Sequence, residues 1–190
     1  MVFSGPSRCG KSRFCYALCD NAYVKGAGKW FDGYYNESVA IFDECQCLGQ
    51  SAALILKITD RYPARVERKG SMTYFNACLN LFTSNLAYHE ALVNDKESND
   101  LFVAVKDRFA LITDVIHMSD AIDYPVVKLR DFIKQPSAPA IISWKGASVA
   151  VARVESSSRF PVSDLLQCMV TAGVFSDEPV SLEDQLQEGE

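Results

Sequence analysis

The sequence predicts an α/β protein of three layers, in which helices cover both faces of a mainly parallel central sheet. A glycine-rich loop at residues 5–12 follows a short apolar run and precedes a helical segment. A continuous apolar run at residues 38–42 and a mostly apolar run at 77–83 have the length expected of strands that are buried on both faces. Helical segments separate these runs, and strands that alternate with helices generally form a parallel sheet.

The glycine-rich loop reads G-x-x-x-x-G-K-S, the P-loop pattern that binds nucleotide phosphates. Glycines allow backbone N–H groups to turn towards a phosphate, and the dipole of the following helix favours its negative charge. We expect Lys11 to contact the β- and γ-phosphates of ATP and the Ser12 hydroxyl to bind Mg²⁺. The residues assigned to nucleotide binding are Gly5, Pro6, Ser7, Arg8, Cys9, Gly10, Lys11 and Ser12.

The other elements follow from hydrophobic periodicity and from turn residues. A helix is expected at 13–22, directly after the loop, and a second helix at 51–61 ends at Tyr62-Pro63. Residues 65–71 are predicted to form a hairpin with a basic tip. Further strands are predicted at 110–117, 126–132 and 140–144, and further helices at 88–93, 101–109 and 163–172.

The strongest boundary signal in the chain is the proline-containing run at residues 135–139. We therefore predict a P-loop ATPase domain at 1–135, a small extension of unknown fold at 136–176 and an acidic, disordered tail at 177–190. The net charge of −5 comes from this tail, so the overall charge neither supports nor excludes binding to nucleic acid.

The amino-acid composition limits the kinds of protein that this chain can be. The chain is 48% hydrophobic and 23% charged, as expected of a globular protein with a real core. No apolar run approaches the roughly 18–20 residues of a membrane span, so we expect no membrane partner. The seven cysteines are an odd number without a C-x-x-C pair, which favours reduced thiols and an intracellular location.

Three polar residues follow the two buried strands. Asp43-Glu44 comes directly after the first strand, at the sheet edge where α/β proteins bind ligands. We expect Asp43 to hold Mg²⁺ through water and Glu44 to deprotonate the attacking water. An acidic pair there is otherwise a solvated turn. Asn85 ends the second strand, where it either contacts the γ-phosphate or caps the next helix.

Basic residues occur at two further places of interest. Arg108 precedes an apolar strand, where an arginine is either solvated or projects into a neighbouring subunit's site and stabilises transition-state charge. Arg65, Arg68 and Lys69 form the densest positive cluster, at the tip of the predicted hairpin. Such a cluster is either a solvated loop or a contact for DNA phosphates.

Five motifs follow one another along the chain: the P-loop, K-W-F-D-G-Y at 29–34, I-F-D-E at 41–44, D-R-Y-P through V-E-R-K-G at 60–70, and T-S-N at 83–85. Together they resemble the helicase domain of replication initiator (Rep) proteins from circular single-stranded DNA viruses, over roughly residues 2–112. The resemblance implies a superfamily 3 helicase with an AAA+-like core. Such a protein hydrolyses ATP with Mg²⁺, forms a ring, usually a hexamer, and moves along single-stranded DNA in rolling-circle replication.

The resemblance also implies roles for those residues of the nucleotide site that match the motifs of the family. Lys11 and Ser12 match the Walker A residues of the family. Asp43 and Glu44 match the Walker B pair, and Asn85 matches the sensor asparagine.

Outside the nucleotide site, the resemblance implies two further roles and one departure. Lys69 matches the lysine of a hairpin that lines the pore and grips single-stranded DNA, and Arg68 lies beside it. Arg108 is the candidate arginine finger. The chain begins almost on the P-loop and contains only two histidines, so we expect the nicking domain of such Rep proteins to be absent.

Alternative functions remain open at this point. A P-loop kinase would need an acceptor pocket and an arginine-rich lid. A decayed or fragmentary Rep remnant would bind nucleotide without productive unwinding, and a viral helicase of the same superfamily could act on RNA. If the protein is viral, its expected location is the nucleus of the host cell.

Overall fold

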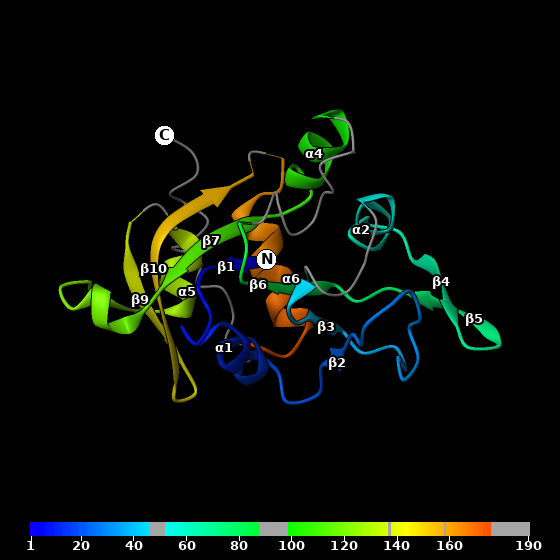
Figure 1. Cartoon of the computed structure of the whole chain (residues 1–190), viewed down its shortest axis with the longest axis horizontal. Coiled ribbons are helices and arrows are strands. Elements are labelled where there is room, and N and C mark those ends of the chain that lie inside the picture. Colours follow the sequence, from blue (N-terminus) through cyan, green and yellow to red (C-terminus); the bar gives the residue numbers. More distant parts are fainter. Residues whose placement is uncertain (46–51, 88–98, 137, 158, 176–190) are drawn as a thin grey trace.

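A computed structural model describes residues 1–45, 52–87, 99–136, 138–157 and 159–175. The helix predicted at 88–93 and the acidic tail predicted at 177–190 lie outside these residues. In chain order (Figure 1), the elements are β1 (Val2–Ser4), α1 (Lys11–Leu18), β2 (Tyr23–Val24), β3 (Val39–Phe42), α2 (Ala52–Ile58), β4 (Ala64–Arg68), β5 (Ser71–Phe75), β6 (Leu79–Ser84), α4 (Asn99–Lys106), β7 (Leu111–Ile116), η2 (Met118–Ala121), β8 (Val126–Lys128), α5 (Leu129–Lys134), β9 (Ala140–Trp144), β10 (Ala147–Ser156) and α6 (Val162–Thr171).

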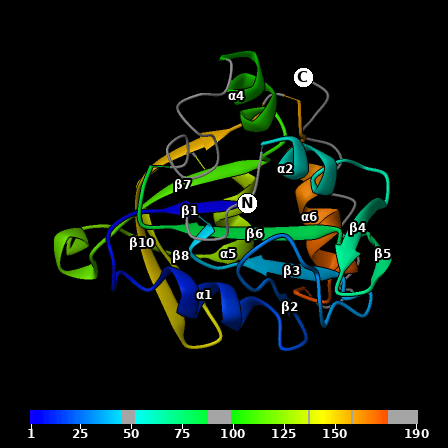
Figure 2. The ribbon, with the colours of Figure 1, turned by 45° about the vertical axis from the view of Figure 1, so that its right-hand side comes forward.

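Eight of these strands form one sheet, in the order β2-β3-β6-β1-β7-β10-β9-β8. The neighbours from β2 to β7 are all parallel, whereas β10 runs antiparallel to both β7 and β9. Figure 2 shows β3, β6, β1 and β7 side by side in the centre of the molecule. The prediction of an α/β fold with a mainly parallel sheet is confirmed.

The sheet separates two hydrophobic cores, because neighbouring residues of a strand point to opposite faces. Phe3 and Ile41 lie in the first core, with buried residues of α1, α5 and α6. Val2 and Phe42 lie in the second core, with buried residues of α2 and α4. Each of these four strand residues is fully buried. Helices therefore cover both faces, which gives the three layers that the sequence predicts.

One predicted element is wrong in part. The strand expected at 126–132 ends at Lys128, and residues 129–134 form the helix α5 instead. Leu129, Phe132 and Ile133 are its buried residues, a spacing that belongs to one face of a helix. A short apolar run does not distinguish a strand from a short helix, so packing against the sheet decides between them.

The longest described strand, β10, is not among the predicted elements. Its apolar residues alternate only partly, since Val149, Ala150 and Val151 are all buried. Pairing of β10 with β7 brings residues beyond 136 into the main sheet. The sheet and the first core therefore continue across the predicted boundary at residue 135.

A second, two-stranded sheet consists of β4 and β5 alone. Lys69 and Gly70 join its strands, and Gly70 has a φ of 76°, a conformation that glycine adopts without strain. This hairpin forms one end of the molecule along its longest axis (Figure 1). The predicted hairpin with a basic tip is confirmed. Within the described part of the chain, no helix has the length and apolar character needed to cross a membrane.

Candidate nucleotide and DNA site

The P-loop joins the carboxyl end of β1 to the amino end of α1 and is packed tightly against the sheet. The Gly5 N–H donates to the Ser84 carbonyl oxygen at 3.1 Å. A Cβ atom at Gly5 would lie 1.9 Å from the carbonyl oxygen of Val115 in β7, so no other residue fits there. The loop is therefore held against β6 and β7, the two strands that flank β1.

The Lys11 side chain is 5% exposed and is surrounded by neutral oxygens. Its Nζ donates to the carbonyl oxygens of Gly5 at 2.9 Å and Pro6 at 2.7 Å, and to Asn85 Oδ1 at 3.0 Å. Among the described residues, no carboxylate forms an ion pair with this ammonium group. An anion beside Lys11 is therefore electrostatically favoured. The contact with Asn85 brings two predicted site residues together from positions 74 apart in the sequence.

Ser12, Asp43 and Thr83 form one hydrogen-bond network. The hydroxyls of Ser12 and Thr83 both donate to Asp43 Oδ1, each at 2.6 Å. Thr83 Oγ1 also accepts the backbone N–H of Glu44 at 2.9 Å. The ends of β3 and β6 and the start of α1 are thereby tied to one carboxylate oxygen.

Glu44 is the residue immediately after this carboxylate, and its backbone is constrained. Its φ of 47° lies in the left-handed region that non-glycine residues rarely adopt. Strained backbone of this kind is common at functional sites, where surrounding contacts maintain it. The Glu44 side chain is exposed. The cavity beside it has a volume of about 230 Å³ and is lined by Ser7, Arg8, Gly10, Lys11, Ser12, Arg13, Glu44, Thr83 and Asn85.

This cavity is smaller than the roughly 300–1,000 Å³ of pockets that enclose a small molecule. A ligand as large as a nucleotide would therefore be only partly enclosed by one chain. Ser12 lines the cavity, and Asp43 lies beside it, bonded to the lining residues Ser12 and Thr83. This donor set fits Mg²⁺, which prefers oxygen ligands and usually binds through one or two protein side chains plus water and phosphate. Asp43 and Ser12 would supply those side-chain oxygens. No cluster of three or more His, Cys, Asp or Glu side chains able to hold a metal alone occurs among the described residues.

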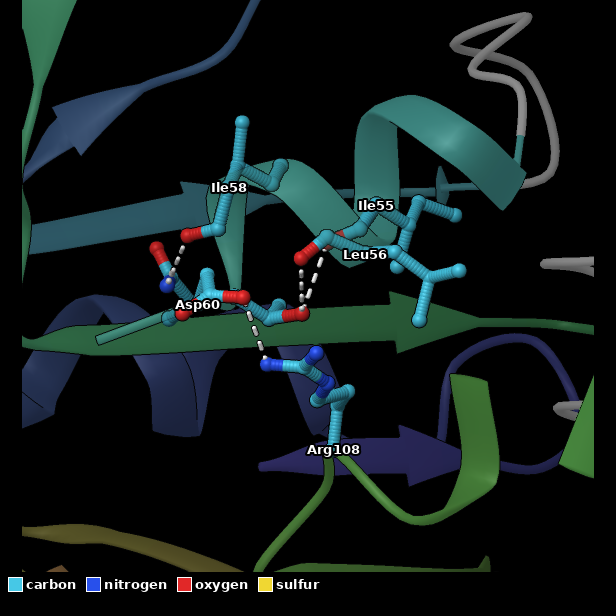
Figure 3. Close-up of polar contacts among 7 residues, drawn as sticks. Ile55, Leu56, Ile58, Asp60 and Arg108 are labelled. Carbon is cyan, nitrogen blue, oxygen red and sulfur yellow. Dashed lines mark hydrogen bonds and ion pairs between the residues drawn. The ribbon is translucent and has the colours of Figure 1, made fainter. Parts of the chain in front are cut away.

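Arg108 lies away from this cavity and is paired within its own chain. Its Nη1 lies 2.9 Å from Asp60 Oδ2 (Figure 3). This hydrogen bond is the main reason why the pKa of Asp60 is lowered. Arg108 precedes β7, which is parallel to β1, so it lies at the sheet edge opposite the P-loop. The structure therefore does not bring Arg108 to the P-loop of its own chain.

The end of α2 lies just before Asp60 and is itself hydrogen-bonded. Thr59 Oγ1 donates to the carbonyl oxygen of Ile55 at 2.7 Å, and Asn80 Nδ2 donates to that of Ile58 at 3.3 Å (Figure 3). The residues just before Asp60 are thus hydrogen-bonded within α2 and to β6.

The basic tip of the hairpin contacts the aromatic segment at 29–35. The Lys69 N–H donates to Asp32 Oδ1 at 2.8 Å, and its Nζ lies 3.9 Å from Asp32 Oδ2. The Arg68 guanidinium lies 5.3 Å from the centroid of the Tyr35 ring. The Lys69 side chain is 76% exposed, so its charge is available to a polyanion.

Three side chains that hydrogen-bond a predicted site residue were not themselves among those predicted: Thr83, Asp60 and Asp32. Thr83 follows from the argument already used for Asp43, because it is a polar residue at the carboxyl end of a buried strand. Asp60 and Asp32 belong to the D-R-Y-P and K-W-F-D-G-Y motifs, but nothing in those motifs indicates their partners. Their partners lie 48 and 37 residues further along the chain, so only the fold reveals them.

Residues 1–86 match the family model described as RNA helicase. The replication-associated protein of goose circovirus is 41% identical over 86 residues, which cover 45% of this chain and 29% of that protein. The corresponding protein of pigeon circovirus is 36% identical over 85 residues, or 45% of this chain and 26% of that protein. That of porcine circovirus 2 is 39% identical over 87 residues, or 44% of this chain and 27% of that protein.

The chain thus spans less than a third of the length of these relatives. The family match includes the P-loop, Asp43, Lys69 and Asn85, and it ends before Arg108. In the part that carries the P-loop, this chain therefore resembles the circovirus-like replication-associated (Rep) proteins and their superfamily 3 helicase domain.

Proposed function

We propose that this chain is an ATP-hydrolysing motor domain that moves along single-stranded DNA during the replication of a circular single-stranded DNA virus or a related element. The observation that carries the proposal is the convergence of Lys11, Ser12, Asp43, Glu44 and Asn85 at one sheet edge. These residues supply a cation, two oxygen ligands, a carboxylate base and an amide. That set is what phosphoryl transfer to water requires.

Each residue has a distinct part in the proposed hydrolysis. The P-loop amides and Lys11 bind the phosphates, and Asn85 orients the γ-phosphate or the attacking water. Glu44 accepts the proton of that water, which attacks the γ-phosphorus as the bond to the ADP oxygen breaks. Mg²⁺, held through Ser12 and Asp43, would neutralise negative charge on the β- and γ-phosphates.

A neighbouring subunit completes the proposed site. The cavity of one chain would enclose a nucleotide only in part, and Arg108 lies at the opposite edge of the sheet from its own P-loop. In a ring, Arg108 would face the P-loop of the next subunit and stabilise charge on the transferring phosphoryl group. We propose a homo-oligomeric ring, with six subunits as the family resemblance implies.

Phosphate release in the presence and absence of single-stranded DNA tests the activity. We expect DNA to stimulate release, Lys11→Ala to abolish it, and Lys69→Ala to keep basal release while losing the stimulation. A phosphorylated acceptor without DNA stimulation would favour a kinase. No release under any condition would favour a remnant that only binds nucleotide, and stimulation by RNA alone would favour an RNA helicase.

A mixing experiment tests the role of Arg108. Arg108→Ala leaves its own P-loop intact, and Lys11→Ala leaves its own Arg108 intact. We expect each variant alone to hydrolyse little ATP. If Arg108 acts on a neighbour, equal mixtures of the two variants regain part of the hydrolysis. Sizing with and without a non-hydrolysable ATP analogue provides the companion measurement. A monomer under both conditions, or no recovered activity, contradicts the shared site. If the element is viral, the host nucleus is the proposed site of action.

A further inference from the structure

The β4–β5 hairpin has one buried face and one exposed face. Ala64 and Val66 of β4 and Phe75 of β5 are each 3% exposed or less and lie in the second core. The cross-strand pairs Arg65↔Tyr74 and Glu67↔Met72 alternate with these residues and so point to the other face. We define the outer face of the hairpin as Arg65, Glu67, Met72 and Tyr74.

We propose that the outer face of the hairpin stacks on the bases of single-stranded DNA, with the Tyr74 ring as its main contact. This inference rests on the proposed function as a DNA motor and extends it from the basic tip to the flank of the hairpin. Tyr74 is 65% exposed and Met72 is 44% exposed. The opposite face of their strand packs on the second core, so these two large side chains are left on the solvent side.

The charges around Tyr74 suit a polyanion. The Arg65 side chain is exposed and lies directly opposite Tyr74. Lys57 Nζ donates to the Arg65 carbonyl oxygen at 2.7 Å, which places a second cation at this end of the hairpin. The carboxylate of Glu67 lies 2.8 Å from Lys29 Nζ, so its charge is compensated. Phosphates that flank a stacked base would thus meet net positive charge.

The spacing on the outer face favours unpaired bases. Tyr74 and Met72 are two residues apart on one strand, a separation of about 6.7 Å between their Cα atoms. Phosphates along one strand of duplex DNA are only about 3.4 Å apart along the helix axis. Neighbouring bases that lie on Tyr74 and Met72 would therefore be unstacked from each other, which a single strand permits and a duplex does not.

The hairpin is held firmly enough to present this face. Phe75, on the buried face, contacts the rings of Phe31 and Tyr34 with centroid distances of 5.3 and 4.9 Å. The Phe31 N–H donates to the Glu67 carbonyl oxygen at 2.8 Å, and Asp32 binds the N–H of Lys69 at the tip. Little backbone ordering would be needed on binding, which favours affinity.

The test compares Tyr74→Thr with Tyr35→Thr. Threonine keeps strand propensity at position 74, and the side chain is exposed, so the variant is expected to fold. Tyr35 is a matched control because it is 76% exposed but contacts Arg68, outside the outer face. Affinity for a fluorescent oligodeoxythymidine and for an abasic strand of equal length is measured by anisotropy at several salt concentrations.

Loss of one stacked base predicts at least about a fivefold weaker affinity of Tyr74→Thr for oligodeoxythymidine. We expect no change on the abasic strand, no change in the dependence on salt, and no effect of Tyr35→Thr. Lys69→Ala should instead reduce the salt dependence, because it removes a phosphate contact.

The possible failures are distinguishable. If the unchanged chain binds no single strand, the proposed motor function is overturned together with this inference. If it binds but Tyr74→Thr binds equally well, or loses affinity equally on the abasic strand, only the stacking surface is overturned. A change in oligomeric state with unaltered DNA affinity would instead assign the outer face to contact between copies of this chain.

Discussion

The Thr83 hydroxyl is the contact that holds the Asp43 carboxylate and the Glu44 backbone in place at once. Thr83→Val removes this hydroxyl and keeps the shape of a side chain that is fully buried. The variant loses one hydrogen bond to a carboxylate and leaves the Glu44 N–H without its acceptor. Thr83→Ser is the matched control, because it keeps the hydroxyl and loses only a methyl group.

The expected magnitude follows from these two contacts. A hydrogen bond to a charged group contributes about 1.5–3 kcal/mol, and an unsatisfied partly buried N–H costs about 1–3 kcal/mol. Since Ser12 continues to bind Asp43, we take the lower part of the range, or about 3 kcal/mol in total for Thr83→Val. For a chain of this length, that corresponds to a fall in Tm of roughly 10 °C. Thr83→Ser should cost only about 1 kcal/mol.

The same variant should also affect hydrolysis. Removing a residue that orients a metal ligand typically costs about 10- to 100-fold in metal affinity or activity. We therefore expect Thr83→Val to need more Mg²⁺ for half-maximal phosphate release, whereas Thr83→Ser should respond like the unchanged chain. Thermal unfolding and a Mg²⁺ titration of phosphate release measure the two effects. Equal Tm values and equal Mg²⁺ responses for the two variants would refute the reasoning.

Three further predictions concern the P-loop, the hairpin tip and a buried lysine. Gly5→Ala should abolish binding of an ATP analogue and lower Tm, because the new Cβ would lie 1.9 Å from a carbonyl oxygen of β7. Gly26→Ala is the control: its Cβ would have no atom within 4 Å, so analogue binding and Tm should stay unchanged. Asp32→Asn keeps an acceptor for the Lys69 N–H but removes the negative charge near the Lys69 ammonium group. Affinity for single-stranded DNA should therefore rise up to about fivefold in anisotropy titrations. An unchanged or weaker affinity contradicts this. Burial lowers the pKa of Lys25 from 10.5 to about 8, so the folded state binds fewer protons than the unfolded chain between these values and gains stability as pH rises. Urea unfolding should therefore show the unchanged chain gaining up to about 3 kcal/mol relative to Lys25→Met between pH 8 and 10.5, and a constant difference would exclude this linkage.

The fold and the centre of the site were predictable from local patterns. The segments 38–42 and 77–83 are mostly apolar, as expected of buried strands. The rule that ligands gather at the carboxyl ends of parallel strands is then enough to bring Asp43 and Asn85 to the P-loop. The contact between Lys11 and Asn85 agrees with that rule. Identifying the hairpin needed only β-branched and turn residues around Gly70.

Other features depended on partners far away in the sequence. The helix at 129–134 replaces a predicted strand because its apolar side chains pack on the sheet, which a short run does not reveal. The strand β10 is recognisable only once β7 is present to pair with it. The ion pair between Arg108 and Asp60 joins two loops that no local pattern relates.

The crossover between β3 and β6 constrains how the proposed motor would work. These two strands are neighbours in the sheet, and the hairpin lies on the chain that connects them. Asp43 ends one strand and Thr83 lies near the end of the other, so the element proposed to grip DNA is attached to the two strands that carry the nucleotide site. The β3–β6 ladder pairs Val39–Phe42 with Leu79–Phe82. A shift of one strand relative to the other would break these backbone hydrogen bonds. Displacement of the hairpin during a cycle of hydrolysis would therefore come from rotation of whole subunits or from bending at the base of the hairpin, rather than from rearrangement of the sheet.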